Sequence, residues 1–98
     1  MVLKYEDGTF IEVQNFWVQT ACDNESFQIK FETEYGFEIF SFGYYDDEKK
    51  MNQESAMLKD MIKINNVVLI DRTNNCVKVG NWKKYCCAMG GSVKNCIV

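Results

Sequence analysis

The sequence predicts an α+β fold: an antiparallel β-sheet of about five to six strands with one amphipathic α-helix packed on one face. Three observations lead to this prediction. Much of residues 2–45 alternates between apolar and polar side chains, residues 45–65 have helical periodicity, and short apolar runs with turn residues follow. The predicted order of elements is β-β-β-β-α-β-β, in a single domain over residues 1–98.

The first two strands are predicted on either side of a tight turn. The sequence VLKYE (2–6) leads into Asp7–Gly8, a pair that favours a two-residue hairpin loop. TFIEVQNFWVQT (9–20) is then expected to return as one strand.

The next two strands follow the turn-forming sequence CDNES (22–26). In FQIKFETEY (27–35) every second residue is apolar, so that Phe27, Ile29 and Phe31 share one face. FEIFSFGYY (37–45) has large apolar residues on both faces. We therefore expect this strand to be central or to be covered on its second face by a helix.

Residues 45–65 are predicted to form the helix. Asp46 or Asp47 is suited to cap its N-terminus, and Asn65–Asn66 is a suitable stop. The expected buried stripe consists of Met51, Ser55, Leu58 and Ile62, joined by Met61.

The last predicted strands are VVLID (67–71), a short apolar run typical of a buried strand, and its hairpin partner CVKVGNW (76–82). Beyond Lys84 the pattern leaves three alternatives open: an edge strand, a strand broken at Gly90–Gly91, or a tail.

The composition indicates a real hydrophobic core, since 47% of the 98 residues are hydrophobic and seven are Phe. No stretch has the pattern of a membrane span or a signal peptide, so we expect a cytoplasmic location, which is the host cytosol if a phage encodes the chain. The five cysteines are an odd number with no export signal beside them, and we expect reduced, mostly buried thiols.

The sequence contains no recognisable catalytic or metal-binding pattern. There is no His, the cysteines lack zinc-ligand spacing and C-x-x-C, and neither a nucleophile elbow nor a phosphate loop is present. Helix capping accounts for the paired carboxylates Asp46 and Asp47. We therefore expect a non-enzyme with no cofactor and no metal site.

The two parts of the chain differ strongly in charge. Residues 1–54 contain twelve acidic and four basic residues, a net charge of −8, whereas residues 55–98 contain two acidic and seven basic residues, a net charge of +5. Such asymmetry is typical of a chain with an oppositely charged partner, and it also arises where two faces of one fold neutralise each other.

Our leading functional hypothesis is a small protein-binding inhibitor. Tyrosine rings anchor interfaces and carboxylates steer toward basic surfaces, so an acidic, aromatic face would occupy a basic site on a larger partner, for example a nucleic-acid-binding host defence protein. The predicted partner-binding residues are Glu12, Glu32, Glu34, Glu38, Tyr44, Tyr45, Asp46, Asp47 and Glu48.

Two alternatives stay open. The first is a single-stranded nucleic-acid-binding protein that uses the basic, aromatic segment 78–94, although the pI near 4.9 opposes it. The second is a small structural domain, or a domain that forms a homodimer or other homo-oligomer. The predicted nucleic-acid-binding residues are Lys78, Trp82, Lys83, Lys84, Tyr85 and Lys94.

The junction FGYYDDEKKMNQESAMLKDMI resembles a pattern in short uncharacterised phage and bacterial proteins, in which a β-meander opened by a DG turn ends in Gly, Tyr and acids that start one helix. The matching positions are Asp7–Gly8, Phe42–Gly43, Tyr44 or Tyr45, and 46–48, and the likeness covers residues 4–62. In style the chain is similar to phage anti-defence inhibitors, anti-CRISPR proteins among them, and to immunity proteins. This resemblance implies a non-catalytic protein that binds a larger target.

Overall fold

Nine strands and one helix form the described part of the chain, residues 1–21 and 25–90 of a computed structural model. The elements are β1 (Val2–Tyr5), β2 (Phe10–Glu12), β3 (Asn15–Thr20), β4 (Phe27–Thr33), β5 (Gly36–Phe42), α1 (Glu48–Asn65), β6 (Val67–Asp71), β7 (Cys76–Val79), β8 (Trp82–Tyr85) and β9 (Ala88–Gly90).

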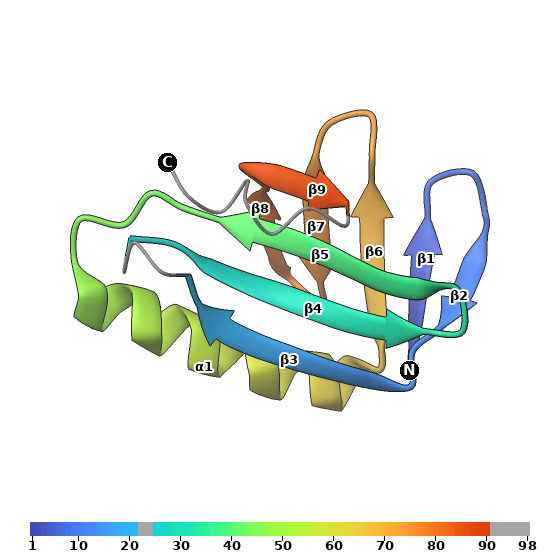
Figure 1. The fold of residues 1–98 in the computed structure, drawn as a ribbon, viewed down its shortest axis with the longest axis horizontal. Helices are drawn as coiled ribbons and strands as arrows, with labels where there is room; N and C mark the ends of the chain where they lie inside the picture. Colours follow the sequence, from blue (N-terminus) through green and yellow to red (C-terminus); the bar gives the residue numbers. More distant parts are fainter. Residues whose placement is uncertain (22–24, 91–98) are drawn as a thin grey trace.

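The strands form two sheets that pack face to face. Sheet A has the order β2-β1-β6-β7-β8, and sheet B has the order β3-β4-β5-β9. In Figure 1 the strands of sheet B run across the view, those of sheet A run upright behind them, and α1 lies along the lower side. The α+β class with one helix is confirmed. The prediction of one antiparallel sheet is wrong, because there are two sheets and β1 pairs with β6 in parallel.

The first difference arises at Val13–Gln14, where the expected strand 9–20 divides. The Val13 N–H donates to the Met1 carbonyl beside sheet A (2.9 Å), and the next N–H, of Gln14, donates to the Glu32 carbonyl in sheet B (2.8 Å). Successive backbone groups are therefore satisfied by different sheets, which lets the chain cross between them without an unpaired donor. Residues 10–12 end up in β2 and residues 15–20 in β3.

The hydrophobic core lies between the inner faces of the two sheets. Sheet B contributes Phe27, Ile29 and Phe31 as predicted, and sheet A contributes the alternate residues of its strands. The predicted two-sided burial of β5 is confirmed over Ile39–Phe42. The buried inner-face residues are Leu3, Tyr5, Val68, Ile70, Val77 and Val79 from sheet A, and Phe27, Ile29, Phe31, Phe40 and Phe42 from sheet B.

Helix α1 ends at Asn65 as predicted and begins at Glu48, three residues after the predicted start at residue 45 and directly after one of the two predicted caps. The Asp47 side chain accepts a hydrogen bond from the Lys49 N–H (2.9 Å), so Asp47 is the N-cap, and Asn66 closes the helix in a left-handed conformation. Met51, Leu58 and Ile62 are buried, and the helix contacts β3, β6 and β7. It therefore packs against both sheets. No helix in the described residues is long and apolar enough to cross a membrane.

The DG hairpin is confirmed with a longer loop than predicted. Four residues, Glu6 to Thr9, connect β1 to β2. The Tyr5 N–H donates to the Thr9 carbonyl, and the Thr9 N–H donates to the Asp7 side chain, both at 2.9 Å. Gly8 has φ 90°, a conformation that favours glycine and explains its place in this turn.

Residues 67–90 form four strands, where the sequence predicted two and left an edge strand beyond Lys84 as one alternative; β9 is such a strand, at the edge of sheet B. The turn at Gly80–Asn81 starts β8 at Trp82, and β9 pairs with β5. Strand β6 is only half buried, since Val67 and Leu69 are exposed on its outer side. Of the predicted break at Gly90–Gly91, Gly90 is the last residue of β9, while Gly91 and the predicted tail lie outside the described residues.

The fully buried Phe40 provides a test of the inter-sheet core. We expect Phe40→Ala to lower the free energy of unfolding by about 3–5 kcal/mol, measured by urea denaturation, because the ring packs between both sheets. Ile64→Ala, at a helix position that is 79% exposed, should change it by no more than about 0.5 kcal/mol. Equal losses in the two variants would contradict the described core.

The N-cap of α1 provides a second test, with a matched control in the adjacent residue. Asp47→Ala should cost about 1 kcal/mol of stability, since the Lys49 N–H loses its acceptor. Asp46→Ala removes the same charge one residue outside the cap and should have a smaller effect. Thermal and urea unfolding of the two variants would check this. A larger loss of stability in Asp46→Ala than in Asp47→Ala would contradict the assignment of Asp47 as the N-cap.

Candidate binding surfaces

The outer face of sheet A carries a row of side chains that crosses all five of its strands. Strand pairing places Phe10 beside Lys4, Lys4 beside Leu69, Leu69 beside Lys78, and Lys78 beside Lys83. We call these five residues the lysine row. Four spacings between strands make the row roughly 19 Å long. Lys4, Leu69 and Lys78 alternate with core residues, and Phe10 and Lys83 alternate with partly buried ones, which is why the row points outward.

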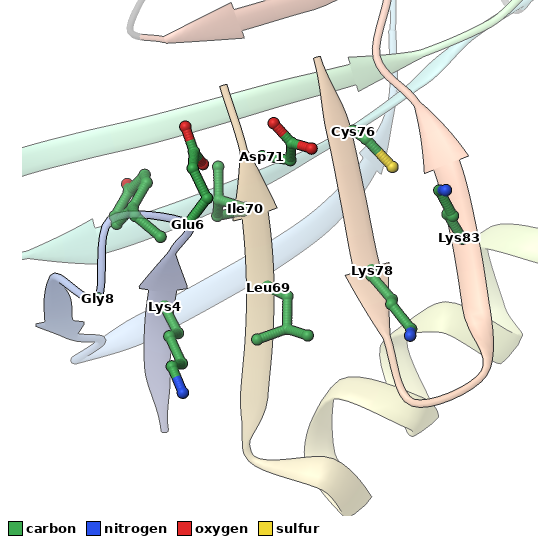
Figure 2. A pocket seen from close by; sticks show the side chains of 10 residues that line it. Lys4, Glu6, Gly8, Leu69, Ile70, Asp71, Cys76, Lys78 and Lys83 are labelled. Atoms are coloured by element: carbon green, nitrogen blue, oxygen red, sulfur yellow. The ribbon is translucent and has the colours of Figure 1, made fainter. Parts of the chain in front are cut away.

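The lysine row borders a depression of about 460 Å³. Figure 2 shows Lys4, Leu69 and Lys78 on neighbouring strands, with Glu6 and Asp71 toward the other end of the hollow. The centre is apolar because Leu69, 39% exposed, lies between Lys4 and Lys78. The depression therefore combines an apolar floor with three cations.

The three lysines of the row have no ion-pair partner among the described residues. Neither of the two ion pairs in the described residues includes Lys4, Lys78 or Lys83. Two of them lie near exposed rings: Lys4 Nζ is 5.4 Å from the centre of the Phe10 ring, and Lys83 Nζ is 5.7 Å from that of Tyr85. Both rings are 61% exposed. The edges of the face thus offer a cation and a ring together.

The two carboxylates of the depression have local hydrogen bonds. Glu6 accepts from the Arg72 N–H (3.0 Å), and Asp71 accepts from the Asn74 N–H (3.1 Å) and its side-chain amide (2.8 Å). The hydrogen bonds from Asn74 lower the pKa of Asp71 below its ordinary value. One end of the depression is therefore negatively charged at neutral pH.

The structure divides the six residues predicted for nucleic-acid binding. Lys78, Lys83 and Tyr85 lie together on the outer face of sheet A. Trp82 points inward instead, where its ring packs edge-on against Phe42 at 5.4 Å. Lys84 is also directed inward, and Lys94 lies outside the described residues.

Lys84 belongs to a polar cluster that joins sheet A to the start of the helix. Its Nζ contacts the carboxylate of Glu54 at 3.0 Å and donates to the Tyr45 hydroxyl, which itself donates to Glu54. Burial and the hydrogen bond to Glu54 raise the pKa of Tyr45 far above its ordinary value. Its ring also packs on Phe27 at 5.8 Å. Tyr45 is therefore part of the fold's interior, with its hydroxyl already bonded.

Glu38, another predicted partner-binding residue, connects the two sheets. It accepts hydrogen bonds from the Tyr5 hydroxyl (2.9 Å) and from Arg72 (2.8 Å), whose guanidinium lies 4.7 Å from the Tyr5 ring centre. Burial raises the pKa of Tyr5. Glu38 thus contributes to inter-sheet contact in the free protein.

The other predicted acidic and tyrosine residues lie at separate places. Glu34 is in the turn that precedes β5, and the residues Tyr44, Asp46, Asp47 and Glu48 follow the end of the same strand. Because β5 has seven residues, roughly 23 Å of strand separates the two places. Glu12 is on β2 of sheet A. Glu32 is on the outer side of β4, where it accepts from the Asn15 side chain at 3.2 Å. The nine residues therefore do not form one continuous face.

The outer face of sheet B carries a group of exposed rings that sequence reasoning did not single out. Lys30 Nζ lies 4.2 Å from the centre of the Phe37 ring and 5.8 Å from that of Trp17, and the two rings are 6.4 Å apart. Trp17 is 42% exposed and Phe37 is 47% exposed. We call these three residues the ring patch.

The cysteines of the described region form no metal site. Within residues 1–21 and 25–90, no three cysteine or carboxylate side chains are grouped so as to hold a metal ion. Cys76 is buried, Cys86 is half-buried and Cys87 is exposed. Burial, helped by the neighbouring thiols Cys76 and Cys87, raises the pKa of Cys86 to about 12. Cys22 and Cys96 lie outside the described residues.

Comparison of the chain with protein-family models, with curated proteins and with solved structures finds no match.

The raised pKa of Cys86 predicts that its thiol reacts slowly with alkylating reagents and that the rate depends on pH. At pH 8 roughly one Cys86 in ten thousand is a thiolate, since this fraction falls tenfold for each pH unit below the pKa. Alkylation of Cys86 by iodoacetamide, followed by peptide mass spectrometry, should be at least about 100-fold slower than that of free cysteine. Its rate should keep rising with pH beyond the ordinary thiol pKa, over the whole range in which the protein stays folded. A rate that levels off near pH 9 would contradict this environment.

Proposed function

We propose that the protein is a non-catalytic binding domain that docks an acidic, partly apolar segment of a partner protein on the outer face of sheet A. The lysine row is the observation that carries this proposal. Three lysines that belong to no ion pair within residues 1–21 and 25–90 lie in one line with an exposed leucine, and this line matches a strand or helix that presents carboxylates around an apolar side chain.

Two features favour a polypeptide over a nucleic acid on this face. The position between Lys4 and Lys78 is occupied by Leu69, so the rings that could stack bases lie only at the two edges of the sheet. Glu6 and Asp71 border the same depression and would repel phosphates. A polypeptide has N–H groups and basic side chains of its own to offer these carboxylates.

The sequence led us to expect a protein-binding function, and the proposal keeps that function. It differs in the charge of the binding surface, which is basic instead of acidic. The acidic residues that were expected to make contact are dispersed, and two of the expected residues, Glu38 and Tyr45, are engaged in internal hydrogen bonds. Lys4 is far from Lys78 and Lys83 in the sequence, and strand pairing assembles the three lysines on one face. Assembly on one face supports the basic surface as the better candidate.

Reversal of two charges in the row tests this function. The probe is a synthetic peptide of alternating Glu and Leu, titrated against the 15N-labelled protein and followed by backbone amide NMR shifts. We expect shifts confined to β1, β6, β7 and β8, and at least tenfold weaker binding in Lys78→Glu/Lys83→Glu, because cations facing the peptide become anions.

The helix provides a matched control, since Lys59 and Lys63 are exposed on α1. Lys59→Glu/Lys63→Glu changes the net charge by the same amount and should leave peptide binding unchanged. If the two double variants lost peptide affinity equally, the total charge of the protein would explain the effect, and this result would contradict docking on the lysine row. If a single-stranded oligothymidine bound sheet A more tightly than the peptide, and with steep salt dependence, the result would contradict a protein partner and favour a nucleic acid.

A further inference from the structure

A second surface lies on the opposite side of the molecule, on the outer face of sheet B. This surface contains the ring patch, in which the side chains of Trp17 and Phe37 are nearly half exposed and lie beside Lys30. Exposed Trp and Phe side chains gathered on one face are typical of the centre of a protein interface. This surface shares no residue with the lysine row.

The ring patch lies beside a charge of opposite sign on β4. Lys30 and Glu32 are two residues apart, so they project from the same side of the strand about 6.8 Å from each other. Lys30 takes part in neither of the two ion pairs found in the described residues, and both side chains are half-buried. Strand pairing puts Trp17 beside Lys30 and Phe37 beside Glu32. One cation and one anion are therefore each flanked by an exposed ring.

This arrangement is complementary to itself under one particular two-fold rotation. If the axis lies between two facing sheets and perpendicular to β4, the rotation reverses the strand direction and places Lys30 of one copy opposite Glu32 of the other, twice. If the axis runs along β4 instead, Lys30 faces Lys30, which is repulsive. The charges thus select an antiparallel alignment of the two β4 strands, with the aromatic rings enclosing the ion pairs.

We infer that the outer face of sheet B is a homodimer interface, in which Lys30 of each copy pairs with Glu32 of the other between the Trp17 and Phe37 rings. The occupant of the face is a second copy of this chain, because the outer face of sheet B carries both members of the ion pair, Lys30 and Glu32. A partner of a single charge would leave one of them unpaired in the interface.

Charge reversal with mixing tests this dimer directly. Sedimentation equilibrium across a range of concentrations, with reductant present to exclude a disulfide through Cys87, should show a dimer for the original chain. Lys30→Glu places two anions against two anions, and Glu32→Lys places two cations against two cations. Each variant alone should dissociate at least tenfold more readily, and an equimolar mixture of the two should recover a heterodimer.

Two controls keep the outcome independent of folding. Lys63→Glu on the helix should leave the dimer intact, and circular dichroism should show that every variant is folded. Trp17→Ala, which leaves both charges in place, should also weaken the dimer. The inference is overturned if the original chain stays monomeric at the highest concentration, or if the mixture associates no better than its components. Binding of the acidic peptide to sheet A should be the same in all of these variants.

Discussion

The packing of two sheets through one shared apolar layer is the constraint on which the rest of this structure depends. The rings of Phe27, Phe31, Phe40 and Phe42 come from sheet B alone and fill the space against the aliphatic side chains of sheet A. Because strand side chains alternate, every residue committed to that layer forces its neighbours outward. The outer faces are therefore determined by what the core requires, and both candidate surfaces consist of the residues left over.

The polar clusters at the borders of this layer show how the sheets stay aligned. Glu38 of β5 binds Tyr5 of β1 and Arg72 of the β6–β7 turn, and Lys84 of β8 binds Glu54 of the helix. Each cluster joins elements that the apolar layer brings close but does not orient. Hydrogen bonds have directional requirements that hydrophobic contacts lack, so the Glu38 contacts restrict how one sheet turns on the other, and the Lys84–Glu54 contact restricts how sheet A lies on the helix.

The sequence allowed prediction of the local structure far better than of the pairing between distant segments. Capping chemistry limited the ends of α1 to Asp46 or Asp47 and to Asn65–Asn66, where the structure has Asp47 and Asn66, and alternation identified Phe27, Ile29 and Phe31 as core residues. The parallel pairing of β1 with β6 spans more than sixty residues and has no local signal, so Lys4 could not be associated with Lys78 in advance. The same alternation applied to WKKY would have separated Trp82 and Lys84 from Lys83 and Tyr85. The division of residues 9–20 depends on hydrogen bonds to Met1 and Glu32, which only the folded chain supplies.

The two proposed surfaces combine because of where the sandwich places them. The inner faces of the sheets meet in the core, so their outer faces point in opposite directions. A dimer formed through sheet B would leave both copies of sheet A exposed, with one lysine row on each far side. Such a dimer holds two identical basic faces at a fixed separation, and a partner with two acidic segments would gain avidity from binding both. Its second binding event would be intramolecular, so a modest affinity at each row would suffice for tight capture of a repetitive or dimeric partner.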